Sequence, residues 1–119
     1  MPNPYGVPGI SVHELAEKRT SGDDFVLLDV REPQEWRYAS LDEAVVKVPL
    51  SELVRRRLEA LPDDVRDDKS VEVVVMCHHG VRSAQVTAWL RENGWLNARN
   101  LDGGIDAYAR EIDRSVGLY

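Results

Sequence analysis

Apolar and polar positions alternate in blocks along the chain, and each block predicts one helix or strand. Two continuous apolar runs, at 25–30 and 71–76, are typical of strands that are buried on both faces of a sheet. The second run is rich in β-branched residues and gives the strongest strand pattern in the chain. Shorter apolar segments at 44–50, which Pro49 closes, and at 97–101 predict two further strands.

The segments between these runs carry helix signals. Ser11 followed by Glu14 forms a capping-box pattern that predicts a helix over 10–24. Pro33 suits the first turn of a short helix at 32–36. Three more helices are expected, at 52–61 with Ser51 as its N-cap, at 84–93 with Ser83 as its N-cap and Gly94 beyond its end, and at 103–113.

Strands that alternate with helices predict an α/β fold, a mostly parallel sheet with helices on both faces. Residues 1–119 form one domain by length. The Pro- and Gly-rich segment 1–9 is expected to be extended, and 62–70 to be an exposed acidic loop. Ligands of such sheets bind beyond the carboxyl ends of the strands. Cys77 follows one buried strand directly, and Asp29 and Arg31 lie at the end of another.

Composition and charge narrow the function classes. The net charge of -6 argues against a nucleic-acid-binding protein, which normally has a basic face. A single cysteine excludes an internal disulfide and a Cys-rich zinc site, and we expect no bound metal and no cofactor. No apolar stretch is long enough to span a bilayer, and the first ten residues do not resemble a signal peptide. The expected compartment is the cytoplasm, where a lone thiol stays reduced.

The segment "CHHGVRS" at 77–83 is the candidate site. Cys77 begins a loop that leads into a helix N-terminus, where free N–H groups and the helix dipole favour the thiolate form. Gly80 allows the backbone to turn, so that successive amides from His78 through Val81 to Ser83 point into one anion-binding concavity. Arg82 adds a permanent positive charge. His78 and His79 add positive potential when they are protonated.

A lone cysteine at the end of a strand is more often a small buried hydrophobe than a nucleophile. The Gly80 and Arg82 that follow Cys77 favour function, because a core cysteine needs neither of them. The number of residues in the loop then separates two chemistries. Cysteine phosphatases and arsenate reductases place five residues between cysteine and arginine, whereas four separate Cys77 from Arg82. The tighter ring of amides suits one added sulfur atom better than a phosphate.

Four motifs together resemble the rhodanese family of sulfurtransferases, over nearly the whole chain. The loop resembles the family's Cys-x-x-Gly-x-Arg active-site loop. The other three are "LLDVREPQEW" at 27–36, "VPLSEL" at 48–53 and "LDGGIDAYAREI" at 101–112. The ending "GGIDAYAREIDRSVGLY" at 103–119 is also similar to the rhodanese domain of adenylyltransferase-sulfurtransferases. The resemblance implies a rhodanese-like three-layer fold with about five strands.

The resemblance also implies a two-step sulfur transfer. Cys77 takes the outer sulfur of a small anionic donor such as thiosulfate, becomes a persulfide, and passes the sulfur to a thiophilic acceptor. The amides of His78 to Ser83 stabilise the persulfide charge. Arg82 and Arg31 are candidates to hold the donor. Asp29 is expected to orient an arginine or cap the loop, although a structural ion pair explains Asp29 and Glu32 equally well.

Two other functions stay open on the sequence alone. The chain is alternatively a rhodanese-like binding or sulfur-relay module without turnover, whose partner is a sulfur-carrier or persulfide-donor protein. A phosphatase or arsenate reductase is the other alternative, which the loop length disfavours.

Overall fold

The computed structural model describes residues 6–41 and 44–119 of the chain. Its centre is one sheet of five parallel strands in the order β1-β5-β4-β2-β3. This confirms the predicted α/β fold with a parallel sheet of about five strands. The strands are β1 (Gly9–Ile10), β2 (Val26–Asp29), β3 (Val46–Lys47), β4 (Val73–Met76) and β5 (Ala98–Leu101).

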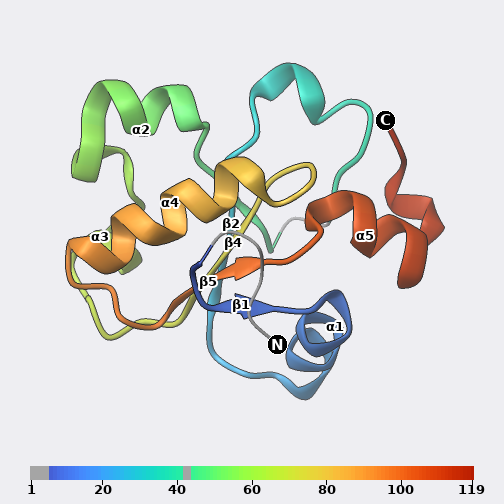
Figure 1. The fold of residues 1–119 in the computed structure, drawn as a ribbon, viewed down its shortest axis with the longest axis horizontal. Helices are drawn as coiled ribbons and strands as arrows, with labels where there is room; N and C mark the ends of the chain where they lie inside the picture. The colour runs from blue at the N-terminus through green and yellow to red at the C-terminus, as the bar shows by residue number, and fades with distance from the viewer. Residues whose placement is uncertain (1–5, 42–43) are drawn as a thin grey trace.

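Helices cover both faces of the sheet, so the molecule has three layers (Figure 1). One hydrophobic core lies under α2, α3 and α4, and the other lies under α1 and α5. The helices are α1 (Val12–Ser21), α2 (Leu50–Arg56), α3 (Asp63–Arg66), α4 (Val81–Glu92) and α5 (Gly104–Glu111), with short 3-10 helices η1 (Pro33–Glu35), η2 (Arg57–Ala60) and η3 (Arg114–Val116). Among the described residues, none of these helices is long and apolar enough to cross a membrane.

The central strand β4 aims Cys77 at one of these cores. Side chains of a strand point alternately to its two faces. Val73 and Val75 therefore pack with the α2–α4 core, while Val74 and Met76 pack with the α1–α5 core. Cys77 continues the first series, which places its side chain on the face that α4 covers.

Two of the predicted helix caps are wrong for the same reason. Helix α2 begins at Leu50, one residue before Ser51, and helix α4 begins at Val81, two residues before Ser83. Both serines therefore lie inside the first turn, where their hydroxyls bond to other elements rather than to their own helix. Gly80 occupies the N-cap position of α4 with a φ of 103°, which a residue with a side chain rarely adopts.

Other local predictions have mixed outcomes. The capping box at the start of α1 is confirmed, because Glu14 N–H donates to Ser11 Oγ at 3.1 Å and Ser11 N–H donates back to the Glu14 carboxylate. The loop predicted at 62–70 is wrong in part, because α3 forms within it around buried Val65. Of the extended segment 1–9, residues 1–5 lie outside the described residues, and Gly9 belongs to edge strand β1.

Candidate active site

The loop from Cys77 to Gly80 joins β4 to α4 and is held from behind by the start of α5. Ile105 N–H donates to the Cys77 carbonyl at 2.9 Å, and Asp106 N–H donates to the His78 carbonyl at 3.1 Å. Gly104 makes this approach feasible, since a Cβ atom there would lie 2.6 Å from the Cys77 carbonyl oxygen. Nothing in the sequence predicted that the Gly103-Gly104 segment contacts the loop. The structure shows this contact, and it explains why position 104 needs a glycine.

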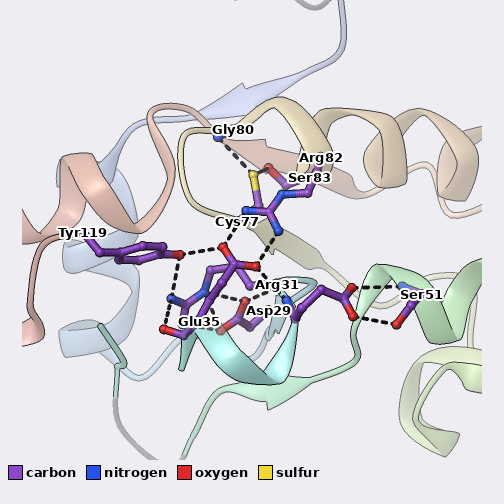
Figure 2. Close-up of polar contacts among 10 residues, drawn as sticks. Asp29, Arg31, Glu35, Ser51, Cys77, Gly80, Arg82, Ser83 and Tyr119 are labelled. Carbon is purple, nitrogen blue, oxygen red and sulfur yellow. Dashed lines mark hydrogen bonds and ion pairs between the residues drawn. The ribbon is translucent and has the colours of Figure 1, made fainter. Parts of the chain in front are cut away.

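The Cys77 side chain is buried, yet its sulfur faces hydrogen-bond donors. Gly80 N–H donates to Sγ at 3.1 Å, and the Ser83 hydroxyl lies 3.3 Å from Sγ (Figure 2). The first hydrogen bond within α4 runs from Ala84 N–H to the Gly80 carbonyl. The N–H groups of Val81, Arg82 and Ser83 precede that bond, as in the open first turn of any helix. Donors of this kind stabilise a negative charge on the sulfur.

Asn100 is a polar residue of this site that sequence reasoning missed. It lies on β5, is fully buried, and accepts from Ser83 Oγ at 2.5 Å through its Oδ1 atom. Its amide nitrogen donates to the Gly80 carbonyl at 3.3 Å and to Asp102 at 3.2 Å. Asn100 therefore links the loop to the sheet and fixes the Ser83 side chain. One feature of the sequence could have identified Asn100. It is a polar side-chain amide in a strand of a sheet that is covered on both faces, where such a group must find hydrogen-bond partners.

Arg82 reaches from the first turn of α4 to Glu35, which lies in η1. Two parallel hydrogen bonds, of 2.6 Å and 2.8 Å, join the guanidinium to both carboxylate oxygens (Figure 2). The bonds from Arg82 outweigh burial and lower the pKa of Glu35 from 4.5 to about 2. The same carboxylate raises the pKa of Arg82 above its already high ordinary value. Glu35 had not been recognised as part of the site, because its partner lies far along the chain.

Arg31 forms a second pair, with Asp29, at the end of β2. Its Nε and Nη2 atoms donate to the Asp29 carboxylate at 3.1 Å and 2.8 Å, and both side chains are buried. Asp29 therefore holds the Arg31 guanidinium in place, and whether this supports donor binding or only the fold stays open. The Glu32 carboxylate instead accepts hydrogen bonds from the backbone N–H and the hydroxyl of Ser51. Contact between Arg31 and a donor stays a prediction, since its Nε and Nη2 atoms are bonded to Asp29 and its Nη1 atom to Tyr119.

Tyr119 joins the two pairs, and nothing in the sequence pointed to it. Its hydroxyl accepts from Arg31 Nη1 at 3.1 Å and donates to Glu35 Oε1 at 2.9 Å (Figure 2). Its ring stacks on His78 with 3.7 Å between the ring centroids and 5° between the planes. The aromatic ring therefore closes one side of the polar network beside the loop.

The two histidines have different surroundings. Burial, and then the nearby His79, lower the pKa of His78, so it is neutral at physiological pH. Its Nε2 atom is buried and has no hydrogen-bond partner. His79 is exposed, and its Nδ1 atom lies 3.8 Å from Asp106.

His78, His79 and Asp106 are the described residues whose ligand atoms lie close enough to hold a metal ion, within 4.8 Å of one another. The planes of the two histidine rings are tilted by 32°, with centroids 3.9 Å apart. Asp106 is also bonded to Arg110 at 3.0 Å. The arrangement does not favour a metal centre.

Comparison with known proteins gives a consistent family assignment. The Rhodanese-like domain family matches residues 11–111. The rice protein "Adenylyltransferase and sulfurtransferase MOCS3" is 33% identical over 92% of this chain, and "tRNA uridine(34) hydroxylase" of Sodalis glossinidius is 32% identical over 78% of it. The solved structure of human single-domain sulfurtransferase TSTD1 has a TM-score of 0.72 and 28% identity, covering 89% of this chain and 98% of that one. This chain spans 26% of the length of each of the two curated relatives.

Proposed function

Because this chain belongs to the rhodanese-like domain family, we propose that it is a sulfurtransferase that carries a sulfane sulfur on Cys77 as a persulfide. The observation that carries the proposal is the surroundings of the sulfur. Cys77 Sγ accepts a hydrogen bond from Gly80 N–H and lies 3.3 Å from the Ser83 hydroxyl, at the N-terminus of α4. A core cysteine without chemistry needs no such N–H donor. The Ser83 hydroxyl, which donates its hydrogen to Asn100 Oδ1, adds a second polar group beside the sulfur.

The first step is the transfer of a sulfur atom to the enzyme. The Cys77 thiolate attacks the outer sulfur of thiosulfate or of a persulfide. A bond forms between Sγ and that sulfur as the donor's S–S bond breaks, and the electron pair leaves on sulfite or on the donor thiolate. The amides of the loop from His78 to Ser83 then stabilise the charge of the enzyme persulfide. In the second step a nucleophile, cyanide in an assay or a thiol, takes the outer sulfur and returns Cys77 to its thiolate.

The sulfur of this reaction comes from a small anionic donor of the thiosulfate type, or from a partner protein. A relay between proteins is the second candidate function, with poor turnover of small donors. The rice relative, whose name includes both an adenylyltransferase and a sulfurtransferase, favours a sulfur-carrier protein as that partner. The reduced thiol that the first step needs fits the cytoplasm, which is the compartment that we propose.

Intact mass spectrometry tests the proposal. Purified protein is incubated with thiosulfate or with glutathione persulfide, separated from the donor and weighed. We expect the wild-type protein to gain the mass of one sulfur atom and the Cys77→Ser variant to gain none. No gain from either donor, or an equal gain in Cys77→Ser, contradicts the proposal. Hydrolysis of an aryl phosphate that depends on Cys77 would instead identify a phosphatase.

A further inference from the structure

Each arginine beside the sulfur is matched by one carboxylate. Arg82 pairs with Glu35 through two short hydrogen bonds, and Arg31 pairs with Asp29. The formal charges of these four groups sum to zero. A dianion that approaches Cys77 therefore meets two neutralised pairs and not two free cations. The prediction that Arg82 and Arg31 hold an anionic donor did not include these carboxylate partners.

The Glu35 carboxylate is itself fixed in position. Glu32 N–H donates to its Oε2 atom at 2.9 Å, and the Tyr119 hydroxyl donates to its Oε1 atom at 2.9 Å. Its side chain is only 16% exposed. Glu35 cannot rotate into solvent without breaking these bonds as well as the pair with Arg82. The negative charge of Glu35 therefore stays beside Arg82 when a donor approaches.

We propose that Glu35 is a specificity-determining residue that selects against dianionic sulfur donors and in favour of donors with a lower charge. The inference rests on the sulfur transfer proposed above. A carboxylate bonded to the loop arginine repels the sulfonate group of thiosulfate and also occupies the bidentate face of the guanidinium. A monoanionic thiosulfonate or persulfide meets less repulsion and needs no bidentate contact. The substrate class is thus a singly charged sulfane donor.

Two small donors isolate the effect of charge, since both present one transferable sulfur on a sulfonyl group. Thiosulfate carries two negative charges, and methanethiosulfonate carries one. With either donor the Cys77 thiolate forms a bond to the terminal sulfur, the S–S bond breaks, and its electron pair departs on sulfite or on methanesulfinate. Both reactions leave the same persulfide, so the difference in kcat/KM reports only donor recognition and the leaving group.

The experiment compares kcat/KM for both donors in the wild type and in Glu35→Gln. Glutamine keeps the shape of the side chain and removes its charge. We expect kcat/KM for thiosulfate to rise about tenfold, which corresponds to about 1.4 kcal/mol. We expect the value for methanethiosulfonate to change by less than about threefold. Because each donor is compared with itself across variants, the different leaving groups cancel.

Two controls locate the effect. Glu32→Gln removes a carboxylate from the same segment, one that bonds to Ser51 and not to Arg82, and should leave the ratio of the two donors unchanged. In the double variant Glu35→Gln with Arg82→Ala, the rise in kcat/KM for thiosulfate should disappear. The variant has no Arg82 guanidinium that could bind thiosulfate once the Glu35 charge is removed.

Two results would overturn the inference. If Glu35→Gln lowers kcat/KM for both donors alike, Glu35 merely holds Arg82 in place. If it raises both alike, charge discrimination is absent. Failure of the proposed function is a different result, because Cys77 would then gain no sulfur from either donor when the wild-type protein is weighed.

Discussion

The two arginine–carboxylate pairs of the site join the same chemical groups but differ in their surroundings. Asp29 and Arg31 are two residues apart and completely enclosed, with side chains 1% and 0% exposed. Glu35 and Arg82 are 47 residues apart, and the Arg82 side chain is 31% exposed. A buried pair is costly to break, whereas a pair that reaches solvent can be altered at modest cost. We therefore expect the first pair to contribute mainly to stability, and the second to be the pair that our proposal assigns to the recognition of the donor.

Asp29→Ala should have the largest effect on stability, because it leaves the Arg31 guanidinium buried without its charge partner. We expect the free energy of unfolding to fall by about 3–5 kcal/mol, as measured by chemical denaturation. The double variant Asp29→Leu with Arg31→Leu is the control, since it removes both charges and should cost less than Asp29→Ala alone. A loss below about 1 kcal/mol for Asp29→Ala would show that the buried pair contributes little.

Acid should weaken the Glu35–Arg82 pair. The pKa of Glu35 in the folded protein, about 2, lies below its ordinary value of 4.5, chiefly because of Arg82. The folded state therefore binds its proton less readily than the unfolded state, and the pair stabilises the protein fully above pH 4.5. That contribution, about 1–2 kcal/mol after solvent screening, is lost as the pH falls toward 2.

Denaturation of the wild type and of Glu35→Gln at a series of pH values measures this contribution. The two stability curves should be separated above pH 4.5 and should converge as the pH falls toward 2. A constant separation over the whole range would contradict the assignment.

Arg82→Ala should separate function from stability, in contrast to Asp29→Ala. The free energy of unfolding should fall by only about 1 kcal/mol, because the side chain is partly exposed. The KM for thiosulfate should rise clearly, since the variant leaves the Glu35 charge beside the sulfur without compensation. Steady-state kinetics and thermal unfolding of the same preparation test both parts. Unchanged kinetics would show that Arg82 plays no part in recognising the donor.

Tyr119→Phe should have the smallest effect. The variant removes the hydroxyl that bridges Arg31 and Glu35 and keeps the ring that stacks on His78. We expect a loss of about 0.5–1.5 kcal/mol. A double-mutant cycle with Glu35→Gln measures the coupling between the two side chains. Full additivity would mean that the hydroxyl does not connect the pairs energetically.

Predictions from the sequence succeeded where the signal is local. The apolar runs gave the strands, Ser11 and Glu14 gave the start of α1, and a spacing of a few residues marked the loop of Cys77 and Arg82. The family and the parallel fold follow from such patterns, and comparison with known proteins confirms both. The catalytic and donor-binding roles of the loop residues stay predictions.

The errors and omissions concern contacts between distant residues. Ser51 and Ser83 are residues of the type preferred at an N-cap, but their hydroxyls bond to Glu32 and Asn100, which are distant in the sequence. Each helix therefore begins before its serine. Asn100, Glu35 and Tyr119 carry no local pattern, because each acquires its role from a residue far along the chain. Only the folded arrangement shows that the charge of Arg82 is compensated.

The contact of α5 with the back of the loop has a consequence for how the site is made. Three of the loop's carbonyls accept hydrogen bonds from residues near the end of the chain, at Asn100, Ile105 and Asp106. These donors come from β5 and α5, so the loop has its observed shape only when both elements are packed against it. Conditions that loosen α5 without unfolding the sheet should therefore lower the reactivity of Cys77.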